Sequence, residues 1–392
     1  MPRWPLQVYS SVIVLLMGCL IGVVNAAEYS ATAQIEAGLE TDNNVRLVPD
    51  DEDAISGYRL SPDFTGRVLT PTLDAKFSLL LDLDRFDDSA YDTDDQDLKL
   101  SLKRQWQTDE FGVSGGLKRD STRTSELQDT GRISNQTVRK ETASVSPYWL
   151  HTLDQRHSVR ADFSYQDVEY ASNNYSDYEA MAASFSWLYQ LTERTALQLQ
   201  FHGSNFETDG VFQSVESDAF GLRAGFETAI TERLQLNVLA GASRVDTSYL
   251  TTLANVSDDQ STATFVDAKL NYSSERSRWG VQLSSDATPS GDGYLRVNNR
   301  ISTNWVYQLS PYMETTLQIL YGENESLDDR IQDQRDYANI EASVRYRLSP
   351  KWNIIARYRH RQQDRENQAG AAESDALFLT LRYYPSEMTW SR

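Results

Sequence analysis

The sequence predicts an all-β protein, a transmembrane antiparallel up-and-down β-barrel of about 18 strands with short turns at one end and long loops at the other. Three observations lead to this prediction. Apolar and polar residues alternate along most of the chain, short turns alternate regularly with long polar segments, and tryptophans gather beside the short turns. After the first 26 residues, no stretch approaches the roughly 20 apolar residues of a spanning helix, which excludes a helical membrane protein.

The first 26 residues have the pattern of a secretory signal peptide. Arg3 precedes an apolar run over residues 12–24, and the small residue Ala26 suits a cleavage site. Lipoprotein processing at Cys19 is the alternative, but Met17 fits that motif badly and the apolar run continues past the cysteine. We therefore expect a signal peptide over 1–26, a barrel over 27–384 and a C-terminal tail over 385–392.

The strands are predicted from a period of two. In the opening segment, residues 29–39, apolar side chains occupy every second position and polar side chains occupy the positions between them. Segments 73–83, 220–226 and 338–346 repeat this pattern. A tilted strand needs only about 9–12 residues to cross a bilayer, so each segment is long enough to span it.

Turns set the number of strands. Short turns are expected near Thr70, Gln107, Leu153, Leu191, Ile230, Ser273, Leu309 and Leu348. Longer polar segments separate them, for example 40–57, 85–94, 121–136, 245–260 and 362–374. Eight short turns and nine long loops require 18 strands and place both chain ends on the short-turn side. Propellers and solenoids also repeat, but they do not alternate short turns with long loops in this way.

Tryptophans near the short turns favour a membrane over a soluble sandwich. We predict an aromatic girdle at the membrane–water boundary, formed by Trp106, Trp149, Trp187, Trp279, Trp305 and Trp352. Core aromatics of a soluble β-sandwich would have no reason to prefer one kind of turn. Lipid offers no hydrogen-bond partner, so the sheet must close on itself, as in the outer membrane of a Gram-negative bacterium.

With the apolar face outward, the polar face lines a lumen that is too wide for side chains to fill. Its last third carries eight arginines that we predict to line the solute path: Arg296, Arg300, Arg345, Arg347, Arg357, Arg359, Arg361 and Arg382. Guanidinium groups suit carboxylate, sulfate or phosphate. The alternative is that they pair with acidic neighbours such as Glu314 and Glu341. The early strands form a wall of mixed sign, from Asp74, Lys76, Asp82, Asp84, Lys99 and either Lys103 or Arg104.

The formal net charge of −20 comes from acidic residues that crowd the long loops. They either bridge to lipopolysaccharide phosphates through divalent cations or form a solvated, repelling surface. Catalysis is not expected. His202 with Ser204 and Glu207 is the only arrangement near an outer loop that could serve a serine hydrolase, and chance explains it because Ser and acidic residues abound in all these loops. No cofactor, metal site or nucleic-acid surface is expected from the sequence.

Some short motifs resemble outer-membrane β-barrels of exopolysaccharide loci. Residues 38–45 are similar to the opening strand of these proteins, and the Ser-x-x-Trp-x-Tyr-Gln-Leu pattern at 184–191 and 302–309 is similar to theirs too. The family includes the barrels of exosortase systems and of Wzx/Wzy-type export. The resemblance implies a conduit for a secreted polysaccharide that works with a periplasmic polysaccharide-export protein and an inner-membrane co-polymerase.

Three functions follow, in order of preference. The first is an exopolysaccharide export pore for capsule or biofilm matrix, with a partly Arg-lined lumen. The second is a general or anion-preferring diffusion porin for small solutes, for which the loop 121–136 would form the constriction, although it lacks an acidic cluster. The third is a structural or adhesive surface barrel, and none of the three is an enzyme. Outer-membrane lipid and lipopolysaccharide are expected partners of all three.

Overall fold

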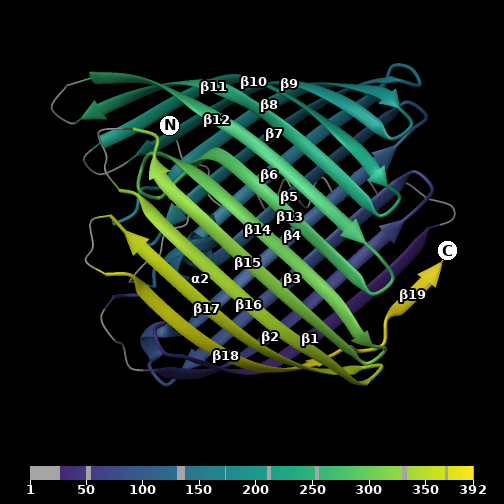
Figure 1. The fold of residues 1–392 in the computed structure, drawn as a ribbon, viewed down its shortest axis with the longest axis vertical. Helices are drawn as coiled ribbons and strands as arrows, with labels where there is room; N and C mark the ends of the chain where they lie inside the picture. The colour runs from purple at the N-terminus through teal and green to yellow at the C-terminus, as the bar shows by residue number, and fades with distance from the viewer. Residues whose placement is uncertain are drawn as a thin grey trace.

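The computed structural model describes residues 27–49, 54–129, 137–172, 174–209, 213–251, 256–328, 333–366 and 370–391. The predicted signal peptide, including Cys19, lies outside these residues. Eighteen antiparallel strands form a closed barrel, because β1 pairs with both β2 and β18 (Figure 1). These strands are β1 Glu28–Asp42, β2 Ile55–Leu69, β3 Leu73–Phe86, β4 Thr93–Gln105, β5 Asp109–Ser121, β6 Arg139–Thr152, β7 His157–Tyr170, β8 Tyr178–Thr192, β9 Thr195–Asp209, β10 Gln213–Thr231, β11 Leu234–Thr251, β12 Val256–Ser273, β13 Ser277–Pro289, β14 Leu295–Ser310, β15 Met313–Ser326, β16 Arg335–Ser349, β17 Trp352–Arg365 and β18 Ala372–Tyr383.

The predicted fold class is confirmed, and all eight short turns lie at one end of the barrel (Figure 1). Side-chain oxygens satisfy the backbone of these turns. Thr231 Oγ1 accepts hydrogen bonds from the N–H groups of Arg233 and Leu234 at 3.2 and 3.1 Å. Asp154 does the same for Arg156 and His157 at 2.7 and 3.0 Å. The polar turn residues therefore fix the tight connections without a buried, unpaired amide.

Several strands are longer than the sequence suggested. The barrel strands have 12 to 19 residues, and the expected long loop at 245–260 is wrong, since β11 and β12 run through most of it. The sequence of this segment is largely polar, but some of its side chains that face the lumen are apolar or aromatic and are buried. Val245 is 1% exposed, and the buried Tyr249 donates its hydroxyl to Asp328 at 2.7 Å. A bilayer needs only about 9–11 residues per tilted strand, so β10–β12 project beyond it on the long-loop side.

The outer surface of the barrel is apolar and exposed. Leu39, Phe201, Phe220 and Leu377 point away from the lumen and are 59% to 69% exposed. Exposing such a surface to water would cost a free energy of roughly 25 cal/mol per Å² of apolar area. Lipid removes that cost, and the closed sheet leaves no backbone edge in the hydrocarbon region. The alternation therefore separates a lipid face from a solvent face.

The predicted girdle residues lie on the outside at the short-turn end. Trp279 stands directly opposite Trp305 on the neighbouring strand, and Trp352 lies 4.5 Å from the Tyr383 ring. Trp187 lies 5.7 Å from His157, and Trp106 and Trp149 are exposed beside their turns. This placement fits an interfacial belt.

The C-terminal segment continues the barrel wall. Within the predicted tail 385–392, residues Met388–Ser391 form a short strand, β19, that pairs with the first residues of β1. Trp390 stacks on Tyr29 at 5.5 Å. The strand covers the part of the β1 edge that β18 does not reach, since β18 pairs only with residues Ile35 to Asp42.

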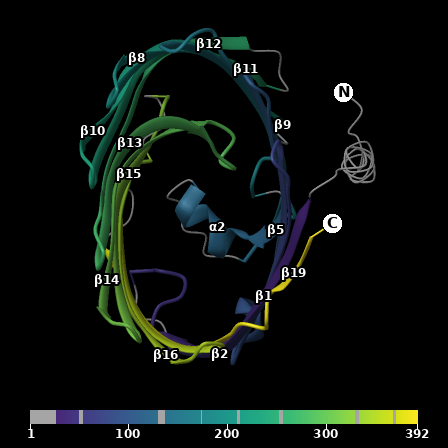
Figure 2. The ribbon, with the colours of Figure 1, turned by 90° about the vertical axis from the view of Figure 1, so that its right-hand side faces the viewer.

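The lumen is not empty. After β5, the chain turns inward and forms helix α2, Thr122–Asp129, which lies in the middle of the ring of strands (Figure 2). The short 3-10 helix η1, Ser89–Tyr91, follows β3. The outer end of the β13–β14 hairpin also curves into the ring (Figure 2). The sequence indicated the long third loop but not its helix.

Candidate functional site

Helix α2 is fixed to the barrel wall by a buried ion pair. Glu126 is fully buried and accepts hydrogen bonds from Lys140 Nζ at 3.0 Å and from the Tyr170 hydroxyl at 2.9 Å. Lys140 and Tyr170 belong to β6 and β7. At the start of the helix, Thr122 Oγ1 accepts a hydrogen bond from the N–H of Val138 at 3.1 Å. These contacts hold α2 inside the lumen.

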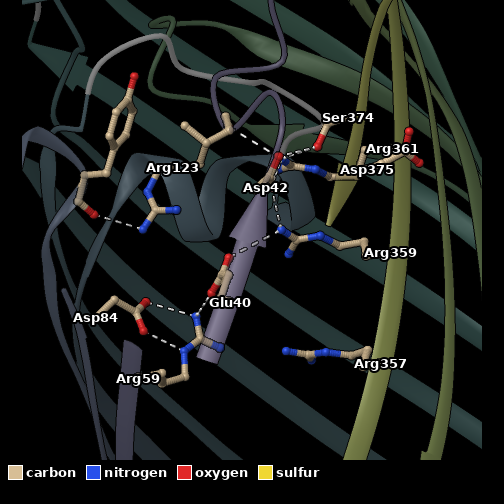
Figure 3. A network of polar contacts seen from close by, with 12 residues as sticks. Glu40, Asp42, Arg59, Asp84, Arg123, Arg357, Arg359, Arg361, Ser374 and Asp375 are labelled. Atoms are coloured by element: carbon tan, nitrogen blue, oxygen red, sulfur yellow. Dashed lines mark hydrogen bonds and ion pairs between the residues drawn. The ribbon is translucent and has the colours of Figure 1, made fainter. Parts of the chain in front are cut away.

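On its other side, α2 presents Arg123 to the first strands of the barrel (Figure 3). Its guanidinium donates to the carbonyl of Tyr91 at 3.2 Å and lies 5.2 Å from the Phe86 ring. Glu40 and Asp84 lie on the same side (Figure 3). The helix therefore reaches from the β6–β7 wall to the β1–β3 wall and narrows the lumen.

An ion-pair network lines the wall next to α2 (Figure 3). Arg59 of β2 makes two bonds to Asp84 of β3, at 2.6 and 2.9 Å. Arg359 and Arg361 of β17 both reach Asp42 of β1, at 3.1 and 2.9 Å. The network joins β17 to β1 across β18, where the barrel closes. Its charges are largely balanced.

Four of the arginines predicted to line the path have acidic partners on other wall strands, two on the adjacent strand and two on β1, across β18. Arg345 contacts Glu314 at 2.6 Å, Arg382 contacts Glu36 at 2.7 Å, and Arg359 and Arg361 share Asp42. The partner Glu314 was expected from the sequence. These contacts match the alternative in which arginine pairs within the wall.

Arg347 and Arg357 are the most available of the predicted set. Arg347 is exposed near the short turns. Arg357 points into the lumen, with its guanidinium 4.0 Å from the Phe378 ring and 3.6 Å from Glu341 (Figure 3). The structure thus brings most of the arginines onto β16–β18, as predicted. Their role in a solute path stays a prediction.

Arg296 holds outer loop segments together, and Arg300 contacts the wall strand β16. Arg296 is fully buried and contacts Asn324, as well as Asp292 at 3.2 Å and Asp333 at 3.0 Å. Burial alone would raise the pKa of Asp333, but the hydrogen bonds and charges of Arg335 and Arg296 outweigh it and lower the pKa to about 2. Arg300 donates to the hydroxyl of Tyr337 at 3.2 Å. Arg296 therefore clamps the segment 290–294 to the segment that follows β15.

Cations cover the faces of several aromatic rings in the lumen. Arg160 lies 4.4 Å from the Tyr148 ring, and Arg223 lies 3.6 Å from the Phe265 ring. Phe378 carries Arg357 and Arg359 at 4.0 and 4.9 Å. Such pairs are attractive, because the ring face is electron-rich. The covered faces are not open to a stacking ligand.

Two polar hollows open at the short-turn end. One, of about 630 Å³, is lined by β1–β6 and includes Thr65, Lys76, Ser114 and Tyr148. The other, of about 530 Å³, is lined by β11–β14 and the turn before β11. It includes amide side chains and cations from Gln235, Lys269, Asn271, Arg278, Gln282 and Asn304. These linings contain the hydrogen-bond donors and acceptors of a hydrated vestibule.

The direction of the side chains separates Lys103 from Arg104 and His202 from Glu207. Lys103 faces inward and pairs with Glu110 at 2.6 Å, while Arg104 faces outward over Trp106 at 5.0 Å. His202 and Ser204 share one face of β9, whereas Glu207 is exposed on the other face, so the three do not converge.

Among the described residues there is neither a metal-binding group nor a membrane-spanning helix. No group of three His, Cys, Asp or Glu side chains there is placed to hold a metal ion. Among the same residues, no helix has the length and apolar character that a membrane-spanning helix requires.

The geometry defines a porin-like outer-membrane β-barrel, a closed sheet with an apolar outside and a polar lumen, in the outer membrane of a Gram-negative bacterium. No protein-family model and no curated protein matches the sequence. The resemblance to exopolysaccharide-locus barrels thus stays a hypothesis.

Solved structures with a similar fold are porins and receptors of outer membranes. OccAB3 of Acinetobacter baumannii is 10% identical over 92% of this chain and 99% of its own, with a TM-score of 0.45. OpdQ of Pseudomonas aeruginosa is 11% identical over 93% and 98%, with a TM-score of 0.45. The ferric citrate transporter FecA is 10% identical over 86% and 60%, with a TM-score of 0.48. At these identities the likeness concerns the fold alone.

Proposed function

We propose that this barrel is a diffusion porin for small hydrophilic solutes, with α2 as its constriction. The observation that carries the proposal is the position of α2 inside the lumen, held by the buried contacts of Glu126 with Lys140 and Tyr170. A segment fixed in this way narrows the bore permanently. It leaves a hydrated path beside it for small molecules.

Polysaccharide export, the leading expectation from the sequence, has less support. A polymer chain needs a continuous wide bore, whereas α2 and the β13–β14 end occupy part of the lumen (Figure 2). Sugar rings commonly stack on aromatic faces, but cations already lie against Tyr148, Phe265 and Phe378. A porin also needs no periplasmic export protein, no co-polymerase and no catalytic residue.

The paired charges favour weak ion selectivity. Arg345, Arg359, Arg361 and Arg382 each contact a carboxylate, so their fields are partly cancelled along the wall. Arg357 and Arg347 have the least compensation and give the lumen a modest preference for anions.

Liposome swelling with neutral sugars of increasing size tests the proposal. Purified protein in liposomes should admit mono- and disaccharides and exclude oligosaccharides of several units. Deletion of the gene should slow the uptake of small solutes and leave the secreted polysaccharide unchanged. Loss of the polysaccharide with normal small-solute uptake would instead establish export.

A further inference from the structure

The barrel wall is split between β12 and β13. β12 pairs with β11 along nearly its whole length, but it pairs with β13 only from Val266 to Ser273. β13 stays paired with β14 as far as Pro289. The outer end of the β13–β14 hairpin leaves the wall and curves inward (Figure 2), so that no strand among the described residues pairs with residues 256–265 on the β13 side.

Apolar packing holds the hairpin end inside. Leu295 and Leu327 pack against Ala219, Val245 and Ala263 on the inner face of β10–β12. Across the lumen, the N–H of Ser176 donates to the carbonyl of Gly291 at 2.8 Å. These contacts hold the hairpin end away from the wall. The hairpin end covers the inner face of β12 and leaves its β13-side edge unpaired among the described strands.

The free edge lies outside the hydrocarbon layer. A tilted strand crosses the bilayer in about 9–11 residues, which accounts for β12 from Ser273 to about Thr264. In the described part of the chain, no strand pairs with residues 258–265 on the β13 side. Such an edge offers a row of N–H and C=O groups to another chain, and proteins commonly protect it with lysine or proline. This segment, Asp-Asp-Gln-Ser-Thr-Ala-Thr-Phe, has neither.

The outer face of β8–β11, on the other side of β12 from this edge, is strongly acidic. Glu179, Glu207 and Glu216 stand directly opposite one another on β8, β9 and β10, and all three are exposed. One row inward, Asp218 stands opposite Asp246. Like charges in directly opposed positions are destabilising. Arg244 is the one cation among them, and it already contacts Asp246 at 3.2 Å.

We propose that the outer edge of β12 binds an extended cationic polypeptide by strand addition. The partner's backbone would pair with residues 258–265, and every second side chain, lysine or arginine, would lie on the outer face beside the carboxylate of Asp258, with Asp246 one strand further away on β11. Two independent observations support it, an edge of β12 that no described strand pairs with and an outer face on β8–β12 where carboxylates outnumber the single cation, Arg244. A lipid headgroup could match the charge, but it could not satisfy a row of backbone groups.

The test uses the full barrel in lipid nanodiscs and a synthetic nine-residue peptide that alternates lysine with valine or threonine. A second peptide has the same sequence but carries N-methyl groups along one edge, so its charge is equal and its strand hydrogen bonds are lost. At about 0.15 M salt, the N-methylated peptide should bind at least about tenfold more weakly. Equal binding of the two peptides would overturn strand addition.

Protein variants locate the site. The pair Asp246→Asn and Asp258→Asn should weaken binding several-fold, while Glu323→Gln with Asp336→Asn, on β15 and β16, should leave it unchanged. A cysteine at Thr262→Cys should cross-link to a cysteine peptide, and one at Thr303→Cys on β14 should not. Equal cross-linking at both positions would contradict the proposal. So would peptide binding that disappears with EDTA, since it would point to cation-bridged lipopolysaccharide.

Discussion

Removing the carboxylate of Glu126 should release α2 from the wall. Glu126 and Lys140 are 0% and 3% exposed and their charged atoms are 3.0 Å apart. Breaking a buried ion pair from one side costs about 3–5 kcal/mol, because the other charge stays buried without its partner. For Glu126→Ala this corresponds to a shift of roughly two to four powers of ten in favour of the released helix. The lumen should then widen.

Single-channel recording in planar bilayers measures the effect. Glu126→Ala should give a larger and noisier conductance than the wild type and should admit longer sugars in liposome swelling. The pair Glu126→Gln with Lys140→Met keeps the site uncharged and should stay close to the wild type.

Glu110→Ala is the matched control. Glu110 also binds a lysine and a tyrosine, Lys103 at 2.6 Å and Tyr148 at 2.7 Å, but it belongs to the wall strand β5. Its loss should leave the pore size unchanged. A folded Glu126→Ala barrel with wild-type conductance and the same size limit would refute the reasoning.

Three further predictions follow from the lumen, the outer clamp and the girdle. Arg357→Gln should shift the reversal potential in a salt gradient toward cations by a small amount, whereas Arg361→Gln, whose charge is compensated by Asp42, should mainly lower stability; equal shifts for both would count against this distinction. The lowered pKa of Asp333 means that its charge stabilises the clamp above about pH 4 and that this contribution, about 2 kcal/mol, is lost as the pH falls through about 2. The difference in unfolding free energy between wild type and Asp333→Asn should therefore be constant near neutral pH and shrink in acid, and a difference independent of pH would contradict the clamp. Trp305→Ala loses the ring opposite Trp279 and the hydrogen bond to Ser277 at 3.1 Å, so the unfolding free energy in lipid vesicles should fall by about 1 kcal/mol or more; no change would argue against an energetic role of the girdle.

Much of the barrel could be predicted from local sequence, because a strand with one lipid face and one water face must alternate. The turns, the strand number and the outward direction of Trp305 all follow from that rule. The rule fails where both faces of a strand are polar or both are buried. The segment 245–260 reads as a loop because Val245 and Tyr249 are buried by residues distant in sequence, Leu295 and Asp328.

The interior was less predictable, because its contacts join strands far apart in the sequence. Arginines at every second position indicate an inward face, but their partners depend on barrel closure, as with Asp42 and Arg361. The helix in the third loop has a weak local signal. Its anchor, Glu126, gains meaning only when Lys140 and Tyr170 are placed beside it.

Site-directed modification of the lumen tests most directly whether solutes pass through this barrel beside α2. A cysteine at Arg357→Cys faces the lumen, and one at Leu379→Cys faces lipid, where Leu379 is 53% exposed on the outer surface. A bulky, water-soluble thiol reagent should sharply reduce the conductance of the Arg357→Cys channel and leave the Leu379→Cys channel unaffected. Conductance that ignores modification at position 357, or that is blocked equally at position 379, would contradict a solute path through the lumen.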